Sequence, residues 1–130
     1  MYTLGHSFVP SGIHTGGLRY HGESPIVSAL VAERLVEARP YVQNPTFEAG
    51  MLFARVEGIV PAPEVNHAIK ATLALALEAR EAREEKVVLF NLCGHGHFDL
   101  GAYEQYLTGN LVNLEHPEEE IERNVARIPD

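Results

Sequence analysis

Apolar residues recur at helical spacing in three long stretches of the chain. The first helix is predicted from about residue 25 to residue 38, because Ser24 can cap its first turn and Pro25 fits that turn. A second helix is predicted over Thr46–Gly58. A third is predicted over residues 62–85, where the first half is apolar on most sides and the second half is charged.

One apolar stretch, Lys86-Val-Val-Leu-Phe-Asn-Leu92, lacks this spacing and is uninterrupted, which is typical of a strand buried on both faces. Short strands are also expected at residues 41–43 and 59–61, and further helices at residues 99–107 and 118–127. The glycine-rich residues before Ser24 predict a loop. This order predicts an α/β fold with a three-layer, open parallel sheet, flanking helices and right-handed crossovers.

Composition narrows the function classes. The chain has 130 residues and 45% apolar side chains, enough for one domain over residues 1–130. Its net charge of −8 argues against a nucleic-acid partner. A single cysteine excludes an internal disulfide, and no apolar stretch is long enough to predict a membrane span. We therefore expect a cytoplasmic protein.

The loop that follows the apolar stretch, residues 93–99, is the first place to expect chemistry, because ligands bind at the carboxyl ends of strands in open α/β sheets. His95 and His97 would point to one face of an extended segment, as metal-binding imidazoles do. Together with His67 they define one alternative function, a metal-binding hydrolase. The competing interpretation is that these glycine-flanked histidines hydrogen-bond the loop backbone.

Glu57 and Cys93 each allow two interpretations. Glu57 stands between apolar residues, so its carboxyl either lies at a crevice or is an exposed carboxylate at a helix end. Cys93 is either a small buried apolar residue or a weak hydrogen-bond donor that contacts a ligand. The glycines at positions 94 and 96 lack the third glycine of a dinucleotide fingerprint, so no phosphate-binding loop is predicted.

Five motifs, in the same order, resemble tryptophan synthase β chains, most closely the type 2, paralogous branch. They are Leu4-Gly-His-Ser-Phe8, Gly16-Gly-Leu-Arg-Tyr-His-Gly22, Phe47-Glu-Ala-Gly50, Glu57-Gly-Ile-Val-Pro-Ala-Pro-Glu64 with His67-Ala-Ile-Lys70, and Leu89-Phe-Asn-Leu-Cys-Gly-His-Gly-His-Phe-Asp99. The resemblance implies the C-terminal portion of a fold type II pyridoxal-phosphate enzyme. Such an enzyme joins L-serine to indole by β-replacement, forming L-tryptophan and water.

The resemblance also implies roles for individual residues. The position of Cys93 usually carries a serine that hydrogen-bonds the pyridine nitrogen of pyridoxal phosphate, and Gly94 follows it closely. A thiol is a softer donor than that hydroxyl. Glu57 corresponds to a glutamate near the cofactor ring. The backbone carbonyls of Tyr20 and Gly22 match positions that help to bind a monovalent cation.

The family's Schiff-base lysine, catalytic glutamate and glycine-rich phosphate loop have no counterpart here and lie upstream in the resemblance. We therefore expect no catalytic residue in the fragment, no turnover by the isolated chain, and a partner in the missing N-terminal part of the enzyme. Apolar faces and strand edges that this part would cover should make the chain self-associate as a symmetric dimer. A non-catalytic ligand-binding or subunit-interaction module is the other alternative function.

Overall fold

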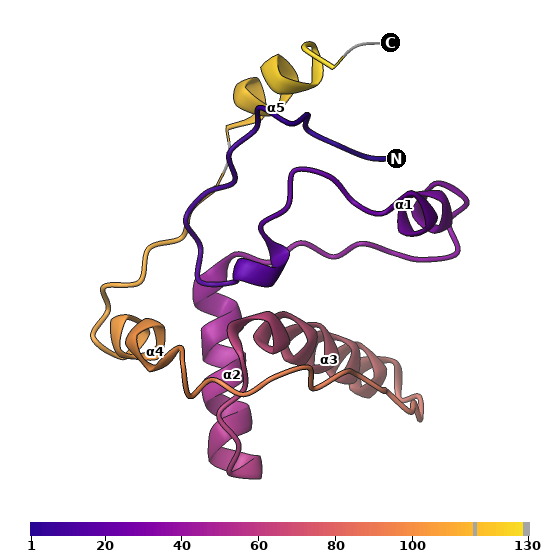
Figure 1. The fold of residues 1–130 in the computed structure, drawn as a ribbon. Helices are drawn as coiled ribbons and strands as arrows, with labels where there is room; N and C mark the ends of the chain where they lie inside the picture. Colours follow the sequence, from indigo (N-terminus) through magenta and orange to yellow (C-terminus); the bar gives the residue numbers. More distant parts are fainter. Residues whose placement is uncertain (116, 129–130) are drawn as a thin grey trace.

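The computed structural model describes residues 1–115 and 117–128, which form helices joined by long extended segments (Figure 1). The elements are the 3-10 helix η1 (Gly16–Leu18), α1 (Pro25–Ala32), α2 (Gln43–Glu57), α3 (Pro63–Ala82), α4 (Leu100–Leu107) and α5 (Glu118–Val125). Within these residues, β structure is limited to two isolated antiparallel bridges, Thr3 with Gly22 and Pro61 with His95.

The predicted three-layer parallel sheet is wrong, because the described part of the chain contains no sheet. Residues 86–92 are extended, but Val87 is fully exposed and Leu89 is 94% exposed, so this segment is not buried on both faces. An extended segment becomes a strand only when a neighbour satisfies its N–H and C=O groups. Residues 86–92 have no such neighbour within residues 1–115 and 117–128.

The first helix is confirmed but is shorter than predicted. The Ser24 hydroxyl accepts a hydrogen bond from the Val27 N–H at 3.2 Å, which is the predicted cap. The helix ends at Ala32, and Arg34 then adopts a left-handed conformation with φ 58°. Only Ser28 of α1 is buried, so this helix packs loosely on the rest of the chain.

Helix α2 begins at Gln43, earlier than predicted, and so occupies the end of the short strand expected over residues 41–43. Thr46 is not its cap, because the Thr46 hydroxyl donates back to the Gln43 carbonyl at 2.7 Å inside the helix. The helix ends at Glu57 because Gly58 is left-handed, with φ 72°, a conformation that glycine adopts without a steric cost.

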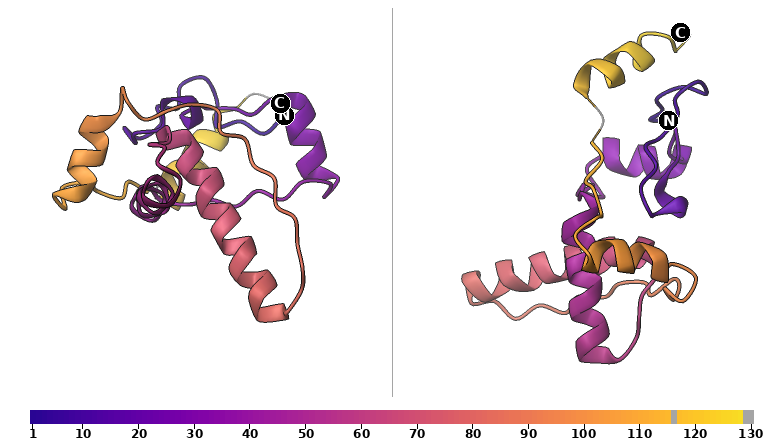
Figure 2. Two further views of the ribbon diagram at one scale, coloured as in Figure 1. Left: turned by 90° about the horizontal axis from the view of Figure 1, so that it is seen from below. Right: turned by 90° about the vertical axis from the view of Figure 1, so that its left-hand side faces the viewer.

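The core lies where α2 meets α3 and α4, and the views in Figure 2 show α2 crossing α3. Between α2 and α3 the buried residues are Ala49, Ala62, Val65 and Ile69. Beside α4 they are Phe47, Ala102, Tyr103 and Leu111. The Phe47 and Tyr103 rings meet edge to face with centroids 4.9 Å apart, so aromatic packing joins α2 to α4.

After α3 the chain turns at Arg83, which is left-handed with φ 57°, and residues 86–92 run back along α3 (Figure 2). Phe90 anchors this segment through an edge contact with Phe53 of α2, with ring centroids 5.9 Å apart. The N-terminal segment and α5 lie together at the other end of the molecule, near both termini (Figure 1). This path brings the turn at Cys93 to the start of α3.

Candidate functional site

Backbone pairing holds the turn after residues 86–92 against the connection between α2 and α3. The two hydrogen bonds are Ala62 N–H to the Gly94 carbonyl, at 3.0 Å, and Gly96 N–H to the Val60 carbonyl, at 2.7 Å. Pro61 and His95 therefore face each other as the antiparallel pair between these bonds. Pro61 has no N–H to donate, and this position in the ladder requires none.

Both glycines of the turn permit this close approach. A Cβ added to Gly96 would lie 2.5 Å from the Pro61 carbonyl oxygen and 2.9 Å from the Tyr103 ring. A Cβ added to Gly94 would lie 3.2 Å from the Ala62 Cβ. The Gly-His-Gly sequence is therefore explained by backbone packing against the α2–α3 connection.

Cys93 lies beside the first turn of α3. The Gly94 carbonyl accepts a hydrogen bond from the N–H of Ala62, the N-cap of α3, so Cys93 directly precedes a residue that is held at the start of this helix. Its thiol is free and exposed, so the interpretation as a buried apolar cysteine is wrong. The unpaired N–H groups at a helix start favour electron-rich groups nearby.

Glu57 occupies the opposite side of the bridge. It is the last residue of α2, its carboxyl is exposed, and it stands four residues before Pro61. Cys93 precedes Gly94, whose carbonyl pairs with the N–H of Ala62. The bridge thus joins the segment that follows Glu57 to the segment that follows Cys93.

The predicted histidine cluster does not form. The rings of His95 and His97 are close, with centroids 4.8 Å apart, and the His97 N–H donates to the His95 ring at 3.3 Å. His67 is half-buried on α3, where loss of hydration lowers its pKa. In the part of the chain that the structure describes, no three His, Cys, Asp or Glu side chains are placed to hold a metal ion. His67, His95 and His97 therefore do not form the metal site on which the alternative of a metal-binding hydrolase rests.

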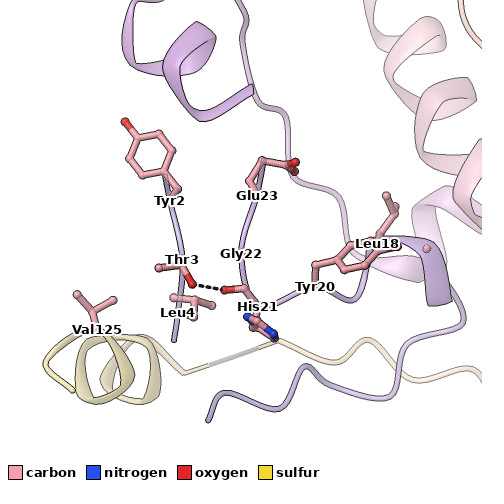
Figure 3. A pocket seen from close by; sticks show the side chains of 10 residues that line it. Tyr2, Thr3, Leu4, Leu18, Tyr20, His21, Gly22, Glu23 and Val125 are labelled. Carbon is pink, nitrogen blue, oxygen red and sulfur yellow. Dashed lines mark hydrogen bonds between the residues drawn. The ribbon is translucent and has the colours of Figure 1, made fainter. Parts of the chain in front are cut away.

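Tyr20 and Gly22 lie in the N-terminal hairpin, which we define as residues 2–4 and 20–23, joined by the antiparallel bridge between Thr3 and Gly22. Both residues line a cavity of about 560 Å³ (Figure 3). The His21 carbonyl between them accepts hydrogen bonds from the Leu4 N–H at 2.7 Å and from the Thr3 hydroxyl at 2.9 Å. Successive carbonyls of an extended segment point to opposite sides. The carbonyls of Tyr20 and Gly22 therefore point away from the N-terminal segment, and neither accepts a hydrogen bond from residues 1–115 or 117–128.

The start of α3 also contacts the 3-10 helix η1, which lies between the two segments of this hairpin. The Glu64 carboxylate, in the first turn of α3, accepts a hydrogen bond from the Gly17 N–H at 2.8 Å. A Cβ added to Gly17 would lie 3.2 Å from the Glu64 side chain. Helix η1 and the turn of Cys93 thus both reach the N-terminal end of α3, where distant parts of the sequence converge.

A buried polar network under the bridge was missed in the sequence. The Tyr103 hydroxyl lies 2.6 Å from the Pro61 carbonyl and 3.1 Å from the side-chain oxygen of Asn66, which is fully buried. Burial raises the pKa of Tyr103 to about 12. Gly50 of α2 makes room for this network, because a Cβ there would lie 2.0 Å from the Asn66 oxygen. A glycine inside a predicted helix was the signal that could have indicated it.

Comparison with known proteins adds the decisive observation. The chain is 60% identical over 111 residues to tryptophan synthase beta chain 2 of Methanosarcina mazei, a match that covers 85% of this chain and 25% of that protein. The chain belongs to the tryptophan synthase β-chain family. Similar proteins of Aquifex aeolicus (59% over 113 residues; 87% and 26% covered) and Pyrococcus furiosus (54% over 115 residues; 88% and 26%) carry the same name.

The chain spans about a quarter of the length of these tryptophan synthase β-chain relatives. This agrees with the motifs, which indicate the C-terminal portion of such a protein. No family model matches the chain. None of the helices in the described residues is both long and apolar enough to cross a membrane.

Of the residues that the tryptophan synthase resemblance assigns to pyridoxal phosphate, Cys93 and Gly94 lie in one turn, whereas Glu57 does not line the same surface. The exposed Cys93 thiol can donate weakly to a ring nitrogen, and Gly94 beside it presents no side chain. Glu57 instead lines an apolar groove of about 200 Å³ between α2 and α3, together with Leu52, Phe53 and their neighbours. The assigned residues therefore offer a donor and an open surface.

Proposed function

We propose that this chain forms the part of a tryptophan synthase β-chain enzyme that contacts the pyridine ring of pyridoxal phosphate. The complete enzyme joins L-serine and indole to give L-tryptophan and water. The observation that supports this proposal most is the pairing of residues 60–62 with residues 94–96, which fixes the Cys93–Gly94 turn at the start of α3.

In this proposal three residues of the chain bind and orient the cofactor. The Cys93 thiol donates a weak hydrogen bond to the pyridine nitrogen, and Gly94 leaves the ring room to approach the backbone. Glu57 contributes its carboxylate at the edge of the ring once the rest of the enzyme has closed the site. Pyridoxal phosphate, when bound, supplies the electron sink for the chemistry at the amino acid.

The N-terminal hairpin has a second binding role in the proposal. A monovalent cation binds the backbone carbonyls of Tyr20 and Gly22. Support comes from the hydrogen bonds to the His21 carbonyl, which fix the alternation of the strand and leave the flanking carbonyls without partners among the described residues. Carbonyl oxygens are suitable ligands for a hard cation.

The isolated chain is proposed to be inactive. Its two lysines are Lys70, inside α3, and Lys86, whose ammonium pairs with the Glu84 carboxylate at 3.2 Å. Neither lies in the turn of Cys93, so neither is placed to hold the cofactor there as a Schiff base. The lysine and the phosphate cradle are assigned to the missing N-terminal part of the enzyme.

A reconstitution assay tests this function. The 130-residue chain is incubated with pyridoxal phosphate, L-serine and indole, alone and with the separately expressed upstream portion of the Methanosarcina mazei relative. We expect tryptophan only in the mixture. The C-terminal quarter of the relative itself, added to the same upstream portion, is the positive control. If that control produces tryptophan and the mixture does not, the proposal is wrong; tryptophan from the chain alone would contradict the proposed inactivity.

Variants of Cys93 test the role of the thiol within the same mixture. Cys93→Ser places a stronger hydrogen-bond donor at the same point and should retain or raise activity. Cys93→Ala removes the donor and should lower kcat by about tenfold, the equivalent of one hydrogen bond of roughly 1.4 kcal/mol. Equal activity of the two variants would contradict the proposed hydrogen bond between Cys93 and the cofactor.

A further inference from the structure

Tyr103 of α4 reaches the α2–α3 connection at the point where the turn of Cys93 is held. Its hydroxyl donates to the Pro61 carbonyl at 2.6 Å, and Pro61 is the residue that pairs with His95. The residues on either side of Pro61 make the two backbone hydrogen bonds that hold the turn. Tyr103 is therefore bonded to the middle of the segment against which the turn lies.

Tyr103 also contacts the other side of this pairing. A Cβ added to Gly96 would lie 2.9 Å from the Cε2 atom of Tyr103, so the ring packs directly against the Gly96 backbone. The Gly96 carbonyl accepts a hydrogen bond at 2.9 Å from the N–H of Asp99, the N-cap of α4. The helix that carries Tyr103 is thus tied to both paired segments, residues 60–62 and residues 94–96.

Asn66, the other partner of Tyr103, indicates that this network is not built for stability alone. The Asn66 side chain is fully buried, and its Nδ2 atom makes no hydrogen bond to any residue that the structure describes. Such a group costs stability that an apolar side chain of similar shape would not cost. A buried polar network instead fixes one arrangement of the groups that it joins. Its effect on the bridge above it is therefore one of position.

We propose that Tyr103 is a positioning residue for the hydrogen bond between Cys93 and the pyridine nitrogen, an inference that rests on the proposed function. The Tyr103 hydroxyl holds Pro61, and Pro61 pairs with His95. This pairing sets where the turn of Cys93 lies. Hydrogen bonds weaken steeply when they are poorly aligned, and a thiol is a weak donor from the start. A small movement of the turn therefore removes the contact.

Tyr103→Phe removes the hydroxyl and keeps the ring, so it tests this role in the mixture of the chain, the upstream portion and pyridoxal phosphate. A residue that acts only through Cys93 can cost no more than the loss of the thiol. We expect kcat to fall by about three- to tenfold, with the KM for L-serine unchanged. In the Cys93→Ala background the same substitution should change kcat by less than about twofold, because the contact is already absent.

The Cys93→Ala background separates positioning from a merely structural role. A structural role would lower kcat by the same factor with and without the thiol, and that result would overturn the proposal. Sucrose favours the folded state without replacing the hydroxyl. Recovery of the wild-type kcat by Tyr103→Phe in sucrose would attribute the loss to unfolding and would also overturn the proposal.

Tyr106→Phe is the matched control. Tyr106 lies on the same helix, and its ring stacks on Phe47 with centroids 6.1 Å apart. None of the side-chain hydrogen bonds among the described residues involves the Tyr106 hydroxyl. This substitution should leave kcat within about twofold of wild type. An equal fall in kcat for both tyrosine variants would overturn the proposal.

NMR of the labelled chain tests the physical link without the upstream portion. The amide resonances of Cys93 and Gly94 should shift in Tyr103→Phe and should not shift in Tyr106→Phe. These resonances report the folded conformation, so a loss of stability alone does not move them. Unchanged resonances in Tyr103→Phe would overturn the proposal.

Failure of this inference can be told apart from failure of the proposed function. If the unsubstituted mixture makes no tryptophan while the C-terminal quarter of the relative does, the proposed function is wrong and the role of Tyr103 fails with it. If the mixture is active and the effect of Tyr103→Phe does not depend on Cys93, only the positioning role is wrong.

Discussion

Gly50 is the residue at which the packing of α2 on α3 leaves no space for a side chain. A Cβ at this position would lie 2.0, 2.5 and 2.8 Å from the Oδ1, Cγ and Nδ2 atoms of Asn66. All three atoms belong to one side chain that is fully buried and hydrogen-bonded to Tyr103. Gly50→Ala therefore requires Asn66 to move or the two helices to separate.

The size of the effect follows from three terms. Forcing a methyl group into a packed interior costs about 1–3 kcal/mol. Losing the hydrogen bond between Asn66 and Tyr103 costs about 1 kcal/mol more. Alanine is favoured over glycine inside a helix by about 1 kcal/mol, which opposes these costs. We expect Gly50→Ala to reduce the free energy of unfolding by about 1–3 kcal/mol.

Urea unfolding followed by circular dichroism measures this difference, with Gly101→Ala as the matched control. Gly101 lies in α4, and a Cβ there would meet no atom within 4 Å. This variant should be stabilised by about 0.4–1 kcal/mol, because it gains helix propensity without a clash. The two substitutions are chemically identical, so their opposite signs would isolate the packing at Gly50.

A double-mutant cycle gives the result that would refute the reasoning. Asn66→Ala removes the three atoms that the new Cβ would meet. In that background Gly50→Ala should cost less than 0.5 kcal/mol or should stabilise the chain, by roughly the propensity term. If Gly50→Ala costs the same with and without Asn66, the close contact between α2 and α3 is not the cause.

Three further predictions concern single side chains. Tyr103→Phe should lower the free energy of unfolding by about 1–2 kcal/mol, because the buried Pro61 carbonyl loses its hydroxyl partner. In urea titrations this difference should shrink as the pH rises from 10 toward about 12, because the raised pKa of Tyr103 in the folded chain makes the wild type lose stability over that range. The pKa of His67 is lowered in the folded chain, so the stability of the wild type should be full above pH 6.5 and should fall below it, where the unfolded chain takes up a proton at His67. Between pH 7.5 and 5.5 the free energy of unfolding should therefore fall less for His67→Leu than for wild type. Cys93→Ser should change stability by less than about 0.5 kcal/mol, and the native thiol should react with a disulfide reagent as fast as in urea, because Cys93 is exposed.

Helices could be predicted because their signals are local. The cap at Ser24, the left-handed glycine at position 58 and the long run of helix formers in α3 each act within a few residues. The predicted sheet failed because strand pairing depends on distant segments. Residues 86–92 have the composition of a buried strand, yet they pair with no described segment, and the backbone pairing with residues 60–62 begins only beyond them, at residues 94–96.

The candidate site was predictable in part for a similar reason. The loop from Cys93 to Asp99 was identified from its glycines, histidines and position after an apolar stretch, and its backbone is indeed fixed at the start of α3. Its contacts with Ala62 and Val60 depend on tertiary structure, as does the network of Asn66 and Tyr103. Sequence spacing also suggested a histidine cluster, which His67, His95 and His97 do not form among the described residues.

The central structural claim is that the α2–α3 connection and the turn of Cys93 form one antiparallel edge. Two-dimensional NMR of the labelled chain tests it directly. The account predicts a strong cross-peak between the Hα atoms of Pro61 and His95, and slow exchange of the amide protons of Ala62 and Gly96, which donate across the edge. Absence of the cross-peak together with fast exchange of both amides would contradict the account.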